Sequence, residues 1–114
     1  MGTVIQDYVN KGYENHSGFQ IKYLDEQPIE SLYKYSEYCL IRRWLRNKHN
    51  VDIAIITNYR NRETKSYRAG LIYVKNNEVD SFFIRPENDN IRFIEYYSYE
   101  LSLEAALEIA LTLI

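Results

Sequence analysis

The stretch from Val51 to Ile56 is an almost unbroken run of β-branched and small apolar residues, interrupted by Asp52 alone. Such a run is typical of a strand that is buried on both faces. Three further segments have strand character, at residues 67–74, 79–84 and 91–97. Asn76 and Asn77 separate two of them and favour a tight hairpin, because asparagine tolerates the left-handed backbone that such turns use. Gly70 inside its strand indicates a bulge or close packing.

Segments with helical spacing of apolar residues precede and follow these strands. The sequence predicts helices over residues 3–14, from Pro28 to about Asn47, and from Ser102 to the last residue. The last helix repeats its apolar residues at intervals of three and four, and we expect Ser102 to cap it. These apolar residues are Leu103, Ala106, Leu107, Ala110, Leu111 and Ile114.

The middle helix has an unusually wide apolar surface. One face carries Ile29, Leu32, Tyr33, Ser36, Leu40 and Trp44, and a second group beside it carries Tyr38, Ile41 and Leu45. This surface is wider than a helix resting on one sheet needs. We therefore expect the helix to be central to the fold or to contact a second subunit.

Together these elements predict one domain over residues 1–114 of the α+β class. We expect an antiparallel four-stranded meander packed against two to three helices. The alternation of Phe19, Ile21 and Tyr23 leaves a fifth strand near residues 19–24 as an option.

Composition places the chain in the cytoplasm. Cys39 is the single cysteine, so no internal disulfide forms, and we expect it to be a small buried hydrophobe. The first residues do not have the pattern of a signal peptide, and no apolar run has the length of a membrane helix. We expect no membrane partner and, if the protein is viral, the cytoplasm of the host cell.

Residues suited to catalysis are scattered. His16 and His49 lie far apart and each neighbours an asparagine, and the four glycines do not make a phosphate loop. We expect no catalytic residue, no metal site and no cofactor, and we favour a protein that is not an enzyme. A metal-dependent nuclease using Asp52 and Asp80 stays as a remote alternative.

Charge is distributed unevenly along the chain. Residues 34–68 hold nine bases and three acids, a net charge of +6, whereas residues 76–114 hold two bases and eight acids, a net charge of −6. A basic surface with aromatic residues is suited to nucleic-acid phosphates and bases, and it is equally suited to an acidic protein surface. The candidate residues for binding a nucleic acid or a partner are Arg42, Arg43, Arg46, Tyr59, Arg60, Arg62, Lys65, Tyr67 and Arg68.

Two resemblances bear on function. The segment from Ile53 to Glu87, with its strand, hairpin and Pro86-Glu87, resembles the first three strands of DnaQ-type 3′–5′ exonucleases. That family depends on an Asp-x-Glu pair, for which this chain has Ile56 and Asn58, so the resemblance carries no catalytic residue. By size and by its Tyr-, Ile- and Asn-rich composition, the chain also resembles small accessory proteins of crenarchaeal rod-shaped viruses. This resemblance implies a viral protein that acts by binding a host or viral macromolecule.

Two functional hypotheses follow. The first is a non-enzymatic interaction protein that forms a homo-oligomer, with a dimer favoured, because the middle helix is broadly apolar and tyrosine supplies 12 of the aromatic residues. The alternative is a weak nucleic-acid-binding protein that uses the basic helix and loop of residues 42–68.

Overall fold

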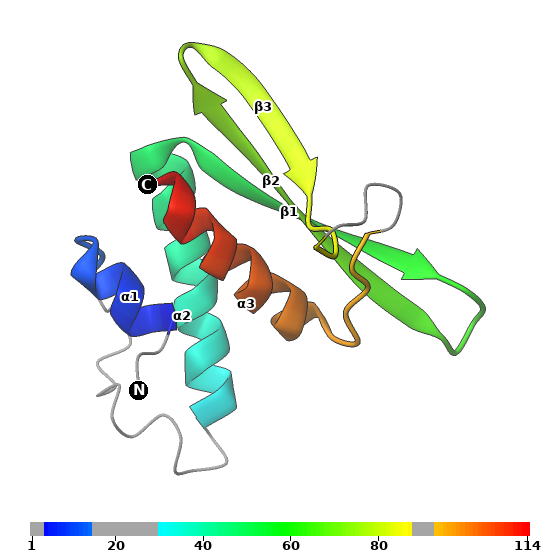
Figure 1. Cartoon of the computed structure of the whole chain (residues 1–114). Helices are drawn as coiled ribbons and strands as arrows, with labels where there is room; N and C mark the ends of the chain where they lie inside the picture. Colours follow the sequence, from blue (N-terminus) through cyan, green and yellow to red (C-terminus); the bar gives the residue numbers. More distant parts are fainter. Residues whose placement is uncertain (1–3, 15–29, 88–92) are drawn as a thin grey trace.

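The computed structural model in Figure 1 describes residues 4–14, 30–87 and 93–114, without the side chains of residues 30–33. The chain is an α+β fold in which three helices lie on one side of an antiparallel sheet with the strand order β1-β2-β3. The elements in chain order are α1 (Val4–Asn10), α2 (Glu30–Trp44), β1 (Val51–Tyr59), β2 (Lys65–Lys75), β3 (Glu78–Phe83) and α3 (Tyr99–Ala110).

The β2–β3 hairpin confirms the predicted asparagine turn. Asn76 and Asn77 have φ values of 53° and 63°, which is the left-handed backbone of a two-residue turn whose twist matches that of the strands. The turn sets the register, because Lys75 and Glu78 become the first cross-strand pair. Gly70 therefore lies opposite Phe83.

The prediction of a fourth strand at residues 91–97 is wrong for the described part of that segment. Its contribution to the sheet is one isolated bridge between Tyr67 and Tyr96. The reason is that β3 and the returning chain share the same edge of β2. β3 pairs with β2 as far as Gly70, and the next edge position, Ala69, accepts the Ile84 N–H. Residues 91–92 and the optional strand at 19–24 lie outside the described residues.

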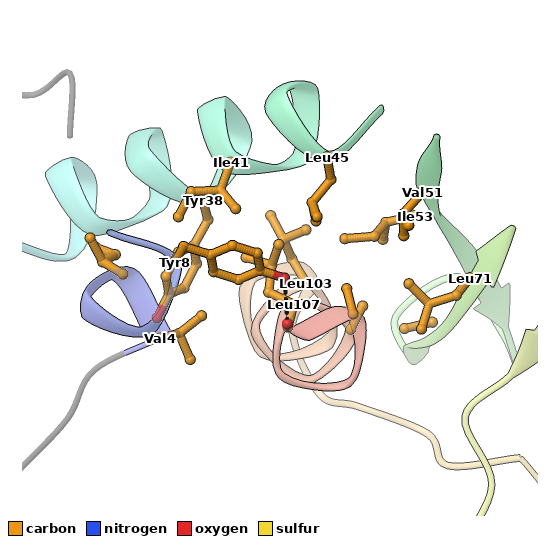
Figure 2. Packing of buried hydrophobic residues seen from close by; sticks show 14 of the residues in the cluster. Val4, Tyr8, Tyr38, Ile41, Leu45, Val51, Ile53, Leu71, Leu103 and Leu107 are labelled. Atoms are coloured by element: carbon orange, nitrogen blue, oxygen red, sulfur yellow. Dashed lines mark hydrogen bonds between the residues drawn. The ribbon is translucent and has the colours of Figure 1, made fainter. Parts of the chain in front are cut away.

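The core lies between the helices and the face of the sheet that α3 covers, here called the inner face. Figure 2 shows side chains of α1, α2, α3 and the sheet converging there, with the Tyr8 hydroxyl donating to the Leu107 carbonyl over 2.6 Å. The predicted apolar face of the last helix is confirmed at Leu103, Ala106, Leu107 and Ala110, all of which are fully buried.

That helix begins earlier than the sequence predicts. Ser98 caps it, since its Oγ accepts the Leu101 N–H over 3.1 Å. Ser102, the predicted cap, is buried inside the helix and donates its hydroxyl to the Tyr99 carbonyl. The start moves because Ser98 has the extended backbone that a cap requires.

The helix α2 turns a different face to the core from the one predicted. Tyr38, Ile41 and Leu45, the secondary group in the sequence, are buried, whereas Ser36 is exposed. Leu40 and Trp44 are partly buried beside them. Cys39 is exposed rather than buried, because it follows Tyr38 by about 100° around the helix and so points away from the core.

The ends of the first two helices have specific backbone caps. α1 ends at Asn10 instead of reaching residue 14, and Gly12 follows it at a φ of 101°. The Tyr13 N–H bonds to the Tyr8 carbonyl and the Gly12 N–H to the Val9 carbonyl, which is a Schellman motif. α2 continues as a π-helical turn, Leu45–His49, closed by Asn50 at a φ of 56°.

Among the described residues, no helix combines the length and the apolar character that crossing a membrane requires.

Candidate interaction surfaces

Three of the candidate basic residues contact other elements of the same chain. Arg42 donates to the Tyr99 hydroxyl over 2.8 Å and to the Ile53 carbonyl over 2.6 Å, so it ties α2 to α3 and β1. Arg46 pairs with Asp52 at 3.2 Å, and Arg68 pairs with Glu95. These guanidinium groups therefore have structural partners and contribute less to a binding surface than their charge implies.

Four candidates lie on or beside the loop that joins β1 to β2, here called the basic tip. Tyr59, Arg60, Arg62 and Lys65 are all exposed there. Tyr67, the neighbouring candidate, is half-buried and makes an edge-to-face contact with Tyr99, with ring centroids 6.0 Å apart.

Arg43 is separated from the basic tip. It is exposed on α2, close to the start of β1, while the tip follows the end of β1 (Figure 1). Nine extended residues span roughly 27 Å, so the predicted basic segment forms two separate groups of charge. Arg43 borders an open pocket of about 440 Å³. The pocket is lined by Tyr13, Leu40, Arg43, Trp44, Asn47 and Lys48.

The two aspartates named for a nuclease do not lie together. Asp52 is on β1 and Asp80 on β3, which are the opposite edges of the sheet. The register also places them on opposite faces, because Asp52 pairs with Ile72 and Asp80 with Tyr73. Within the described ranges, no group of three or more His, Cys, Asp or Glu residues is placed to hold a metal ion.

The face of the sheet turned away from α3, here called the outer face, carries several exposed apolar side chains. Ile56, Ile72, Val74 and Val79 are 49%, 41%, 49% and 73% exposed, although all four belong to paired strands. The expectation that the first strand is buried on both faces is therefore wrong. Val51 and Ile53 are buried against the helices, but Ile56 is not.

A small hollow adjoins Gly70 on the outer face. A Cβ atom on this glycine would lie 2.9 Å from the Phe82 carbonyl oxygen and 2.9 Å from Cδ1 of Phe83, so the Phe83 ring occupies the space beside the glycine. The sequence indication of close packing at Gly70 is confirmed. A cavity of about 110 Å³ remains, lined by Ala54, Gly70, Leu71, Ile72, Ser81, Phe82 and Phe83.

Aromatic and charged side chains border this face on one side. Phe93 contacts Phe83 with centroids 5.4 Å apart, and the guanidinium groups of Arg68 and Arg85 lie 5.3 Å and 4.7 Å from the Phe93 ring. Glu95 accepts hydrogen bonds from Ser66 and Arg68, which hold the pKa of its carboxyl below the usual value. This border, here called the rim, places polar side chains beside apolar ones, as at the edge of many interfaces.

Both edge strands satisfy part of their outward backbone internally. On β1, Asp52 accepts the Ile53 N–H over 2.9 Å, and Arg42 donates to the Ile53 carbonyl. On β3, Asp80 accepts the Ser81 N–H over 2.8 Å. Such charged side chains discourage strand addition at an edge. The outer face therefore has a stronger tendency to associate than the edges have.

Sequence reasoning did not identify the outer face as a site. The available signal is the nearly unbroken apolar run of residues 51–56, which predicts a strand buried on both faces and not an open surface.

Comparison of the chain with protein-family models, with curated proteins and with solved structures found no match, so the interpretation of these surfaces rests on their own chemistry.

Proposed function

We propose that this chain is a non-enzymatic interaction protein that works as a homodimer, with the outer face of its sheet as the contact between two copies. The observation that supports the proposal is the exposure of Ile56, Ile72, Val74 and Val79 on the same face of the sheet. The largest apolar patch on a monomeric protein covers roughly 300–600 Å² and is often a functional site.

The area and the charge of this surface are those of a weak contact between two copies. Three strands over nine residues present roughly 30 Å by 14 Å, or about 400 Å² from each copy. The resulting total of about 800 Å² lies below the roughly 1,000 Å² of specific interfaces, so we expect a weak dimer with a dissociation constant in the micromolar range or above. The outer side chains of β2 and β3 near the turn are uncharged. Asp52 of β1, however, lies on this face beside Ile72 and pairs with Arg46, so its desolvation makes the dimer weaker.

Two substitutions with matched exposure test the proposal. Val74 on the outer face is 49% exposed, and Leu101 on α3 is 50% exposed but lies away from that face. Placing a lysine in an apolar contact buries an unpaired charge. Sedimentation equilibrium over rising concentration should show a dimer for the wild type and for Leu101→Lys, and a monomer for Val74→Lys. A wild type that stays monomeric at millimolar concentration contradicts the proposal.

Binding of nucleic acid is a second candidate function, supported by the basic tip. Tyr59 is 67% exposed there. No ion pair within the described ranges engages Arg60, Arg62 or Lys65. The double substitution Arg60→Ala and Arg62→Ala should weaken binding of single-stranded DNA or RNA, measured as a smaller mobility shift on a native gel. Lack of any wild-type shift at about 50 mM salt rejects this function, because phosphate contacts are strongest at low salt.

The further proposal of a viral accessory protein rests on size and composition alone. It predicts that the coding sequence is found in encapsidated genomes. Its occurrence in cellular genomes alone would overturn the proposal.

A further inference from the structure

We infer that the pocket beside the end of α2 is a binding site for a small phosphate monoester that carries a planar ring, the chemistry of a nucleoside monophosphate. This α2 pocket has a volume of about 440 Å³, within the roughly 300–1,000 Å³ of small-molecule sites. It lies on the helical side of the sheet and not on the outer face, so the inference goes beyond the proposed homodimer and does not depend on it.

One stripe of α2 and of the π-helical turn that follows it supplies most of the lining. The residues of this stripe are Leu40, Arg43 and Trp44 in α2 and Asn47 and Lys48 in the turn. In a regular α-helix, Lys48 would lie about 80° around the axis from Leu40. A π-helical turn contains one more residue, which returns Lys48 toward the stripe. The irregular end of the helix therefore brings a second cation to the same pocket as Arg43.

The aromatic wall of the pocket is the indole ring of Trp44, which other rings hold in place. Tyr8, Tyr13 and His49 contact it edge to face, with ring centroids 6.1, 5.7 and 4.7 Å away. Tyr13 is itself fixed, because its hydroxyl donates to the buried Glu37 carboxylate. A ring that is already ordered loses little entropy when a ligand binds. This wall is therefore suited to stacking with a planar ligand.

The cations of the α2 pocket are available to an anion. Arg43 and Lys48 are exposed, and no ion pair within residues 4–14, 30–87 and 93–114 engages either of them. The described lining contains no carboxylate, and counting Glu37 behind Tyr13 as ionised still leaves a net charge of +1. A phosphate monoester has a charge of about −1.5 to −2 at pH 7 and several acceptor oxygens. It can therefore bind both cations at once, whereas a carboxylate has half that charge.

The fluorescence of Trp44 makes binding at this pocket measurable, because it is the only tryptophan of the chain. The full chain would be titrated with adenosine monophosphate (AMP), with excitation where tyrosine does not absorb. Adenosine, which lacks the phosphate, and inorganic phosphate, which lacks the ring, serve as controls. We expect AMP to change the emission to saturation and each control to bind about tenfold more weakly, because stacking and charged hydrogen bonds each contribute more than 1 kcal/mol.

Arg43→Ala and Arg62→Ala form a matched pair of variants, since both arginines are exposed and Arg62 lies on the basic tip. Arg43→Ala should raise the dissociation constant of AMP on the order of tenfold, because a charged hydrogen bond is lost. Arg62→Ala should leave it unchanged. Lys48→Ala repeats the test with the second cation. Thermal unfolding verifies that all three variants fold, as expected for substitutions of exposed side chains.

Four results overturn the inference. They are an emission that AMP does not change, equal affinity for AMP and adenosine, equal affinity for AMP and inorganic phosphate, and equal dissociation constants for Arg43→Ala and Arg62→Ala. The first removes the site, the next two remove the role of the charge or of the ring, and the last places the bound nucleotide elsewhere. The proposed homodimer is tested separately, by the sedimentation of Val74→Lys.

Discussion

The two faces of the sheet consist of the same kinds of residue in different surroundings. Ile53 on the inner face is 2% exposed, because α3 and α2 pack over it, whereas Ile72 on the neighbouring strand is 41% exposed. Both are β-branched residues in paired strands. The difference shows that an apolar strand pattern indicates how much surface a strand is able to bury, but not which element covers it.

The largest expected effect comes from truncating one isoleucine on each face. Ile53→Ala should lower the free energy of unfolding by about 2–4 kcal/mol, because it leaves a cavity among buried side chains. Ile72→Ala should cost less than about 1 kcal/mol at low protein concentration, where the outer face is open to solvent. Urea denaturation measures both. Equal losses would show that the two faces are equally buried in a single chain.

The next effect concerns the hydroxyl groups of two buried tyrosines, Tyr8 and Tyr13. Burial raises the pKa of the Tyr8 hydroxyl well above its ordinary value, and burial together with the hydrogen bond to Glu37 raises the pKa of Tyr13. In the unfolded chain these groups ionise near pH 10. The folded state then holds more protons than the unfolded state, so their contribution to stability is complete below pH 10 and is lost as the pH rises above it.

Tyr8→Phe separates the contribution of the Tyr8 hydrogen bond from that of the ionisation of its hydroxyl. At pH 7 it should cost about 1 kcal/mol, because the hydroxyl no longer donates to the Leu107 carbonyl. Above pH 10 the stability of the variant should fall less steeply than that of the wild type, because one titrating group is missing. Urea denaturation at pH 7 and at alkaline pH measures both quantities. Parallel pH profiles would contradict the role of Tyr8.

The comparison of faces also explains which elements could be predicted. The spacing of Leu103, Ala106 and Leu107 fixes an inward helix face without any knowledge of the neighbours, and Asn76-Asn77 determines its turn locally. The middle helix was ambiguous because it carries two apolar stripes. The choice of Tyr38 and Ile41 over Leu40 depends on where α1 and α3 pack, which local periodicity does not contain.

The candidate binding residues show the same limit. Arg42, Arg46 and Arg68 were grouped by sequence proximity, but their partners Tyr99, Asp52 and Glu95 come from other elements. These partners become neighbours only when the sheet and the helices assemble. The outer face was overlooked for a related reason, since its exposure depends on the helices all lying on one side.

The smallest expected effect lies at the rim of the outer face, where Glu95 joins the chain beyond β3 to β2. Its folded pKa is lowered, first by the Ser66 hydroxyl and then by Arg68. Its contribution to stability is therefore present above the unfolded value near 4.5 and is lost as the pH falls through the lower folded value.

Glu95→Gln keeps the shape of the side chain but removes its charge. It should cost less than about 1 kcal/mol at pH 7, in the range of partly exposed ion pairs, and less at acid pH as the carboxyl becomes protonated. Because Glu95 does not touch the Gly70 hollow or Val74, dimerisation measured by sedimentation should stay unchanged. If Glu95→Gln abolished dimerisation, the contact between the two copies would lie at the charged border of the outer face and not at its apolar centre.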